Sequence, residues 1–224
     1  MINSMQAGIG ALALLLGWSV PVQAQRVALS IPLNQRGYEE IAHRKGVTVY
    51  RSKSSNIIDL GAEARFNASP DQVLRVLLDY EGQVGAIARL SESKVLSRSR
   101  RSLLVYQRLN LPVISDRDFN LKVAWWRDRD TTWVTYQATR KKGRPPRDGV
   151  VRVTHHLGSW QLKPISGGRQ TLARFQVRID MSGWVPRWLA RSGSGKEVPE
   201  LFVAIDKMIR RSSYRSDACS SKCL

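Results

Sequence analysis

A long amphipathic helix near the C-terminus has to cover a sheet built by most of the preceding chain. Its apolar residues recur at helical spacing: Val198, Leu201, Phe202, Ile205, Met208 and Ile209. Residues 46–180 read mainly as antiparallel strands, interrupted by one short helix. Because one helix must cover the concave side of a strongly curved sheet, the sequence predicts an α+β protein with a gap between helix and sheet. Side chains or a ligand would fill that gap.

The expected elements follow one another closely. Strands are predicted at 46–52 and 58–66, and the second of them alternates apolar and polar residues. Ser69, Pro70 and Gln72 then supply the N-cap, the first position and the capping box of a helix that ends near residue 79. Beyond Gly158 the apolar residues change parity, so we expect a β-bulge there. Six further strands are predicted, at 92–98, 102–110, 117–126, 131–140, 150–162 and 171–180.

The chain opens with an uncharged apolar run. Residues 7–20 form this run, and Val22-Gln23-Ala24 places small side chains before a cleavage site at Gln25. The pattern predicts a signal peptide over 1–24, and therefore export to the periplasm or the medium, although no Lys or Arg precedes the run. The alternatives are an uncleaved anchor and a cytosolic helix. We expect the rest to comprise a tether (25–37), one domain (38–211) and a polar tail (212–224) in which export would allow Cys219 and Cys223 to pair.

The positive charge restricts the partners. The sequence contains 36 Lys and Arg against 18 Asp and Glu, a net charge of +18. Such a charge attracts anionic membranes and nucleic acid alike. We expect an anionic membrane surface and no nucleic acid, because of the predicted export and because no aromatic stacking platform accompanies the basic residues. Arg152, Arg174, Arg178 and the loop 140–147 are expected to make the convex sheet face positive, with a solvated surface without a specific partner as the alternative.

Few residues have a spacing suited to catalysis or metal binding. His155 and His156 are adjacent, so on a strand they point to opposite faces and cannot hold one metal ion. No nucleophile–histidine arrangement and no carboxylate pair can be recognised. We therefore predict no catalytic residue, no metal and no cofactor. The Asp116-Arg117-Asp118 segment is expected to form a structural ion-pair network, with recognition of a lipid head group as the alternative.

Four segments resemble, in order, motifs of START-type lipid-binding domains of the Bet v 1-like superfamily. They are NASPDQVLRVLLDY at 67–80, VYQR at 105–108 with ISDRDF at 114–119, GSWQLKP at 158–164 and IDMSGWVP at 179–186. The resemblance covers 38–211 and implies a helix-grip fold, in which the sheet holds the C-terminal helix over an apolar tunnel for one lipid. Some sterol carriers have an arginine where this chain has Val123, so a charged pair facing a sterol hydroxyl is not implied. The expected export makes the chain similar to the bacterial branch of the family.

The resemblance also implies where a ligand would lie. The tunnel wall would consist of inward-facing residues of two strands and the last helix: Phe119, Leu121, Val123, Trp125, Phe175, Val177, Ile179, Leu201, Phe202 and Ile205. A solid core without a ligand is the alternative. An aromatic and aliphatic cluster beside basic residues would contact a membrane and gate the tunnel, unless it is ordinary core: Trp184, Val185, Trp188 and Leu189. Gly193 and Gly195 are expected to break the helix and act as hinges.

These features predict a monomeric lipid-binding protein that holds one lipid or other hydrophobic ligand and works as a carrier or sensor at an anionic membrane surface. One alternative is a helix-grip enzyme, cyclase-like or hydratase-like, with His155 and Tyr106 as the acid/base pair. Another is a basic module that binds membrane surfaces and has a filled core.

Overall fold

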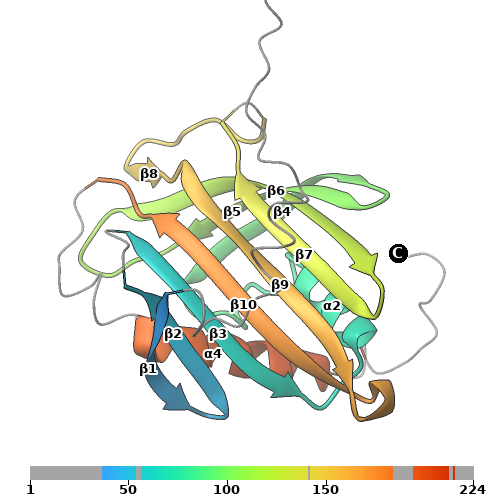
Figure 1. Ribbon diagram of the computed structural model, residues 1–224. Helices are drawn as coiled ribbons and strands as arrows, with labels where there is room; N and C mark the ends of the chain where they lie inside the picture. The colour runs from blue at the N-terminus through green and yellow to red at the C-terminus, as the bar shows by residue number, and fades with distance from the viewer. Residues whose placement is uncertain (1–36, 54–56, 141, 184–193, 212–213, 215–224) are drawn as a thin grey trace, which may run out of the picture. The chain divides into compact units, whose positions relative to one another are not determined.

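One curved sheet contains all the strands that the structure describes. The computed structural model describes residues 37–53, 57–140, 142–183, 194–211 and 214. The strands are β1 (Tyr38–Arg44), β2 (Val47–Ser52), β3 (Ile58–Phe66), β4 (Leu90–Ser99), β5 (Ser102–Leu109), β6 (Asp116–Asp128), β7 (Thr131–Ala138), β8 (Val150–Arg152), β9 (His155–Ile165) and β10 (Gln170–Asp180). They lie in the order β1-β2-β3-β10-β9-β7-β6-β5-β4, with antiparallel neighbours throughout, and β8 adds a parallel pair with β6 (Figure 1).

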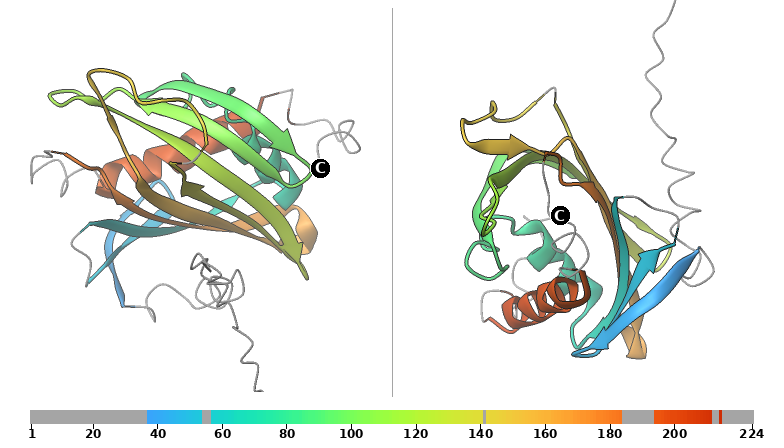
Figure 2. Two further views of the ribbon diagram at one scale, coloured as in Figure 1. Left: turned by 90° about the horizontal axis from the view of Figure 1, so that it is seen from above. Right: turned by 90° about the vertical axis from the view of Figure 1, so that its left-hand side faces the viewer.

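Two α-helices lie on the concave side of this sheet. Figure 2 shows α4 (Ser194–Ile209) enclosed by the curve of the strands, with α2 (Pro70–Leu78) beside it. The predicted capping box starts α2: the Ser69 hydroxyl accepts a hydrogen bond from the Gln72 amide, and the Gln72 side chain accepts one from the Ser69 amide. A short 3-10 turn, η2 (Ser166–Gly168), joins β9 to β10. The prediction of an α+β helix-grip fold is therefore confirmed.

The sequence pattern missed β1. This strand pairs only with β2, at the edge of the sheet, and a bulge between Glu40 and Ala42 shifts its register. Most of its side chains are exposed or half-buried. Because an edge strand with a bulge has no continuous buried face, it shows no alternation of apolar and polar residues.

The expected bulge at Gly158 is wrong. Strand β9 pairs with β10 from His155 to Ile165 without a register shift, and the change of parity comes instead from the break between β8 and β9. Gly158 lies opposite Tyr136 of β7, and a Cβ atom at Gly158 would stand 2.3 Å from the Tyr136 hydroxyl. The glycine therefore leaves room for the phenol ring that crosses over it.

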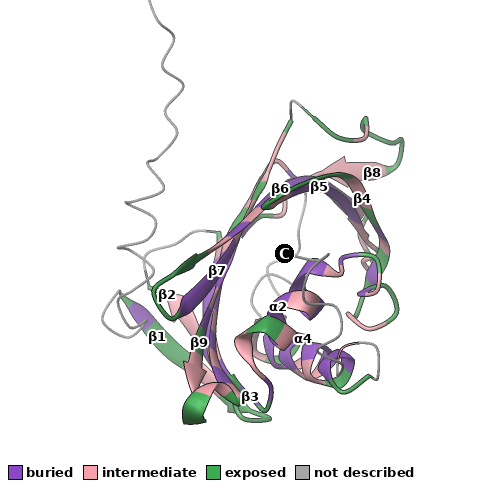
Figure 3. Cartoon of the chain, turned by 90° about the vertical axis from the view of Figure 1, so that its right-hand side faces the viewer, coloured by how far each residue is buried: buried purple, intermediate pink, exposed green. Residues whose placement is uncertain are grey.

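The core lies between the sheet and the two helices. Figure 3 shows buried residues on the strands where they face α2 and α4, and on the helix surfaces that face the strands. Phe202 of α4 stacks on Phe66 of β3 at 5.6 Å between ring centroids and contacts Trp160 of β9 at 5.1 Å. These aromatic contacts fix α4 against the middle of the sheet.

The three arginines expected to charge the convex face are each paired with a carboxylate. The pairs are Arg152 with Asp118 (2.6 Å), Arg174 with Glu63 (2.7 Å) and Arg178 with Asp59 (2.6 Å). The last two join residues directly opposite each other on β10 and β3. These arginines therefore add little net charge to the face, contrary to the sequence-based expectation.

Candidate functional site

The gap between sheet and helices contains a cavity of about 220 Å³. Its wall is formed by the end of α2 and the segment after it, by residues of β4 to β7, β9 and β10, and by α4. The lining residues are Leu77, Tyr80, Gln83, Ile87, Leu90, Gln107, Leu109, Phe119, Leu121, Val134, Tyr136, His156, Trp160, Phe175, Val177, Leu201 and Ile205. None of these residues is Asp, Glu, Lys or Arg, so the lining is apolar with a few neutral polar groups.

Six of the ten residues predicted for the tunnel wall line this cavity: Phe119, Leu121, Phe175, Val177, Leu201 and Ile205. The other four are buried in the core away from it: Val123, Trp125, Ile179 and Phe202. Val123 and Trp125 lie further along β6, and Phe202 is fully engaged with the rings of Phe66 and Trp160. The direction in which a side chain points therefore does not by itself distinguish a residue of the cavity wall from a residue of the packed core.

The two residues considered for acid/base chemistry do not face the cavity. Tyr106 points to the opposite side of the sheet, where its hydroxyl donates to Asp118 at 3.1 Å and Arg144 lies over its ring. His155 is exposed and contacts the Thr154 hydroxyl. The neighbouring His156 and the tyrosine at 136 face the cavity instead, which the sequence analysis did not predict.

His156 is the cavity-wall residue that has a buried polar atom without a hydrogen-bond partner among the described residues. Its ring makes an edge contact with Phe119 at 4.7 Å and with Tyr136 at 5.2 Å between centroids. Its Nδ1 atom is buried and has no hydrogen-bond partner among the described residues. Burial lowers the pKa of His156 to about 4, so the ring is neutral at neutral pH.

Two phenols accompany this histidine. Burial raises the pKa of Tyr80 and of Tyr136 far above the usual value, and the proximity of Tyr80 raises that of Tyr136 further. Both phenols are therefore neutral. The two glutamines of the wall are already engaged: Gln83 donates to the carbonyls of α2, and Gln107 donates to Ser93 at 3.2 Å. Gln83 thereby satisfies carbonyl groups at the C-terminal end of α2.

The Asp116-Arg117-Asp118 segment is structural. Asp116 pairs with Arg108 at 2.6 Å, and Asp118 pairs with Arg152 through both carboxylate oxygens. Arg117 is buried and donates to three main-chain carbonyls, those of Ser115, Met181 and Ser182. The predicted structural network is confirmed, and these groups are not free to recognise a head group.

Several predictions concern residues outside the part that the structure describes. These are the signal peptide, the tether up to residue 36, the gate residues Trp184, Val185, Trp188 and Leu189, the hinge residue Gly193, and Cys219 with Cys223. Gly195 lies within α4 (Ser194–Ile209), so it does not break the described helix. Among the described residues, no helix has the length and apolar character needed to cross a membrane, and no group of three or more His, Cys, Asp or Glu side chains could hold a metal ion.

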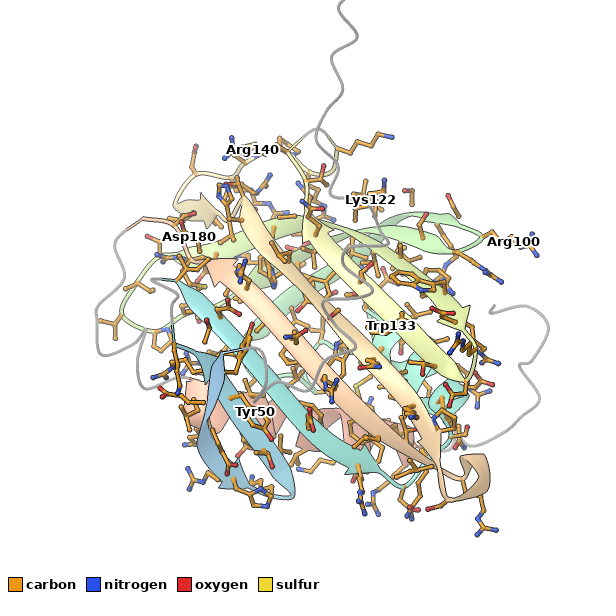
Figure 4. All side chains as sticks on the ribbon, viewed as in Figure 1. Tyr50, Arg100, Lys122, Trp133, Arg140 and Asp180 are labelled. Atoms are coloured by element: carbon orange, nitrogen blue, oxygen red, sulfur yellow. The ribbon has the colours of Figure 1, made fainter. Side chains whose placement is uncertain are left out.

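A basic hollow lies on the outer surface, beside the loop after β7. It has a volume of about 290 Å³ and is lined by Arg140, Lys142, Gly143, Arg144, Pro146, Arg152 and Thr154. Arg144 pairs with Glu92, Arg152 pairs with Asp118, and Arg140, labelled in Figure 4, donates to the Thr154 hydroxyl. Two of its four cations are thus neutralised within the protein.

Solved structures with a similar fold include several lipid transfer proteins. No curated protein matches the chain. A STAR-related lipid transfer protein from Xanthomonas axonopodis (fragment 25–204) is 23% identical with a TM-score of 0.71, covering 78% of this chain and 99% of that one. Human STARD10 is 15% identical with a TM-score of 0.73 (84% and 77% covered), and human StAR-related lipid transfer protein 5 is 16% identical with a TM-score of 0.67 (84% and 95% covered). At these identities the likeness shows the fold alone.

The family follows from the sequence comparison. A family model described as START domain matches residues 86–214, which is more than half of the 224 residues. The matched region runs from the segment after α2 to the end of α4 and contains most of the cavity wall. The chain belongs to the START domain family.

Proposed function

We propose that this protein binds one hydrophobic ligand in the cavity beneath α4 and acts as a lipid carrier or sensor. The observation that carries the proposal is the cavity itself, which is lined mainly by apolar side chains and has no charged residue in its wall. Apolar surface removed from water contributes about 25 cal/mol per Å², so such a wall favours hydrocarbon. Similar folds occur in proteins named for lipid transfer, which supports the same class of ligand.

The cavity limits the size of the buried part of the ligand. Its volume of about 220 Å³ is smaller than the roughly 300–1,000 Å³ of ordinary ligand pockets. A phospholipid with two chains therefore does not fit unless α4 moves away from the sheet. We infer that the buried part is a single chain or a compact ring system.

The proposed place of action is an anionic membrane surface reached after export, with the protein as a monomer. The net charge of +18 supports this, because each Lys or Arg near an anionic surface contributes about 1 kcal/mol. The paired arginines of β8 and β10 are not the source of the attraction. Flotation with vesicles of phosphatidylglycerol and of phosphatidylcholine tests this part: equal recovery with both would contradict it.

Native mass spectrometry of the exported protein, followed by organic extraction, tests the ligand. A 1:1 adduct in the mass range of a lipid, or of a single-chain amphiphile added to the protein, would support the proposal and identify the ligand class. The same spectra report whether the protein is a monomer. A clean apo mass that does not change with any added lipid would contradict the proposal and favour a surface-binding module with a filled core.

An enzyme is a second candidate because the rings of His156 and Tyr136 are in contact inside the cavity, and imidazole and phenol groups are among those that enzymes use as general base and acid. Turnover of a bound hydrophobic substrate that is lost in His156→Phe and retained in His155→Phe would favour it. A ligand recovered chemically unchanged after long incubation would favour the carrier.

A further inference from the structure

We propose that the ligand carries an uncharged oxygen group, a hydroxyl or carbonyl, on the part that is buried in the cavity, and that His156, Tyr136 and Tyr80 bind this group. The inference rests on the proposed function, because it specifies the chemistry of the same ligand. It assigns these three residues, and no charged residue, to polar recognition.

The first argument is the unsatisfied histidine. Buried polar atoms in proteins nearly always have a hydrogen-bond partner, and an atom without one costs free energy. His156 Nδ1 is buried and has none among the described residues, although it belongs to the cavity wall. Nδ1 itself has almost no surface open to the cavity, so a small turn of the imidazole would bring it to a ligand oxygen, which would supply the missing partner.

The second argument is convergence. His156 comes from β9, Tyr136 from β7, and Tyr80 from the residues just after α2, so three separate elements bring hydrogen-bonding groups to one small cavity. The rings of His156 and Tyr136 are in contact, and Tyr80 lies close enough to Tyr136 to raise its pKa. A neutral imidazole and two phenols can together both donate to and accept from one oxygen group.

The third argument is that the geometry is held rigidly. His156 is wedged between Phe119 and Tyr136, at 4.7 and 5.2 Å between ring centroids. Gly158 permits the position of the Tyr136 ring, since its missing Cβ would overlap the hydroxyl. Strands position polar groups more precisely than loops do, so His156 and Tyr136 need only a small adjustment when the ligand enters.

The fourth argument concerns charge. No Asp, Glu, Lys or Arg lines the cavity, so an ionised carboxylate, phosphate or amine buried there would lose its hydration without gaining a counterion. The buried group is therefore an alcohol, ketone or ester oxygen. A charged head group, if the ligand has one, lies outside the cavity.

A series of matched amphiphiles tests the inference. Dodecanol, 2-dodecanone, dodecanoate and dodecane share one chain and differ in the polar group, and their binding can be followed by the fluorescence of Trp160 in the wall. We expect the alcohol and the ketone to bind about 3- to 10-fold more tightly than dodecane or dodecanoate, which corresponds to one or two net hydrogen bonds. Affinities within about twofold across the series would overturn the inference and indicate that water satisfies His156.

Variants of the cavity residues complete the test. In His156→Phe and Tyr136→Phe the preference for the alcohol should fall to about twofold or less, while the affinity for dodecane is retained. His155→Phe is the matched control, because His155 is exposed on the opposite face of the same strand, so this change should leave the preference unchanged. Equal melting temperatures of the unliganded variants would show that they fold.

The two proposals fail differently. If the alcohol preference persists in both cavity variants, these residues do not bind the oxygen group, and the inference is wrong although a hydrophobic ligand binds. If no member of the series binds, dodecane included, the proposed function is contradicted and the inference with it.

Discussion

Replacing Phe202 by alanine should remove the main anchor of α4. The side chain is 2% exposed and contacts three aromatic rings, those of Phe66, Trp160 and Phe175, at 5.6, 5.1 and 6.4 Å between centroids. Truncation of a buried phenylalanine costs about 3–5 kcal/mol, and each aromatic pair adds about 0.5–1.5 kcal/mol beyond the buried area. We therefore expect Phe202→Ala to lower the free energy of unfolding by about 4–5 kcal/mol, near the upper end of the range for a buried phenylalanine. The total stability of a domain is about 5–15 kcal/mol.

Leu201→Ala is the matched control on the neighbouring position of the same helix. Leu201 is half-buried and already faces the cavity, so its truncation removes fewer contacts and should cost only about 1–2 kcal/mol. It should also enlarge the cavity and favour ligands with a longer chain. The pair of variants thus separates a core residue from a wall residue, although both were predicted to line the tunnel.

Urea unfolding followed by far-ultraviolet circular dichroism measures both losses. Phe202→Ala should lower the midpoint strongly with an unchanged m value, and should lower Tm by about 8–20 °C for a domain of this size. A loss below about 2 kcal/mol for Phe202→Ala, or an equal loss for Leu201→Ala, would refute the assignment of Phe202 to the core and the view that its ring stack holds α4.

Three further predictions follow from single contacts. The pKa of His156 is about 4 in the folded protein and about 6.5 in the unfolded chain, so the unfolded chain binds more protons between these values. Stability should fall as the pH drops from 6.5 toward 4, by up to about 1.4 kcal/mol per unit, and His156→Phe should remove this part of the slope in urea titrations. Asp118→Asn should cost about 3–5 kcal/mol in the same assay, because it leaves the Arg152 guanidinium without its carboxylate; a loss under 1 kcal/mol would show that the pair is dispensable. Gly158→Ala should cost about 1–3 kcal/mol and weaken ligand binding, because the new Cβ would meet the Tyr136 hydroxyl at 2.3 Å and the Gln176 carbonyl at 2.5 Å; unchanged ligand affinity would show that Tyr136 does not contact the ligand.

Local patterns predicted most of the fold. The alternation in β3 and β10, the capping box of α2 and the helical spacing in α4 each depend on residues close together in the sequence. The edge strand β1 was missed because its bulge and its exposure leave no such alternation. The order of these elements, with four family-like motifs, was enough to predict the START fold.

The candidate site depended much more on tertiary structure. Parity indicates which side chains of a strand point inward, but the curvature of the sheet and the seat of α4 decide where inward residues meet a gap. For this reason Phe119 and Leu121 line the cavity while Val123, on the same face of the same strand, is packed core. The spacing of residues in the sequence carries no information about the distance between the sheet and α4.

The polar groups of the cavity show the same division. The sequence identified an adjacent histidine pair and correctly placed its members on opposite faces, but His155 rather than His156 was chosen as the inward one. The choice depended on whether β8 and β9 form one strand, and only the pairing of β8 with β6 shows that they do not. Local residue patterns were thus enough to predict most elements and the family. Tertiary packing decided which residues face the cavity, because a cavity exists only where two layers do not touch.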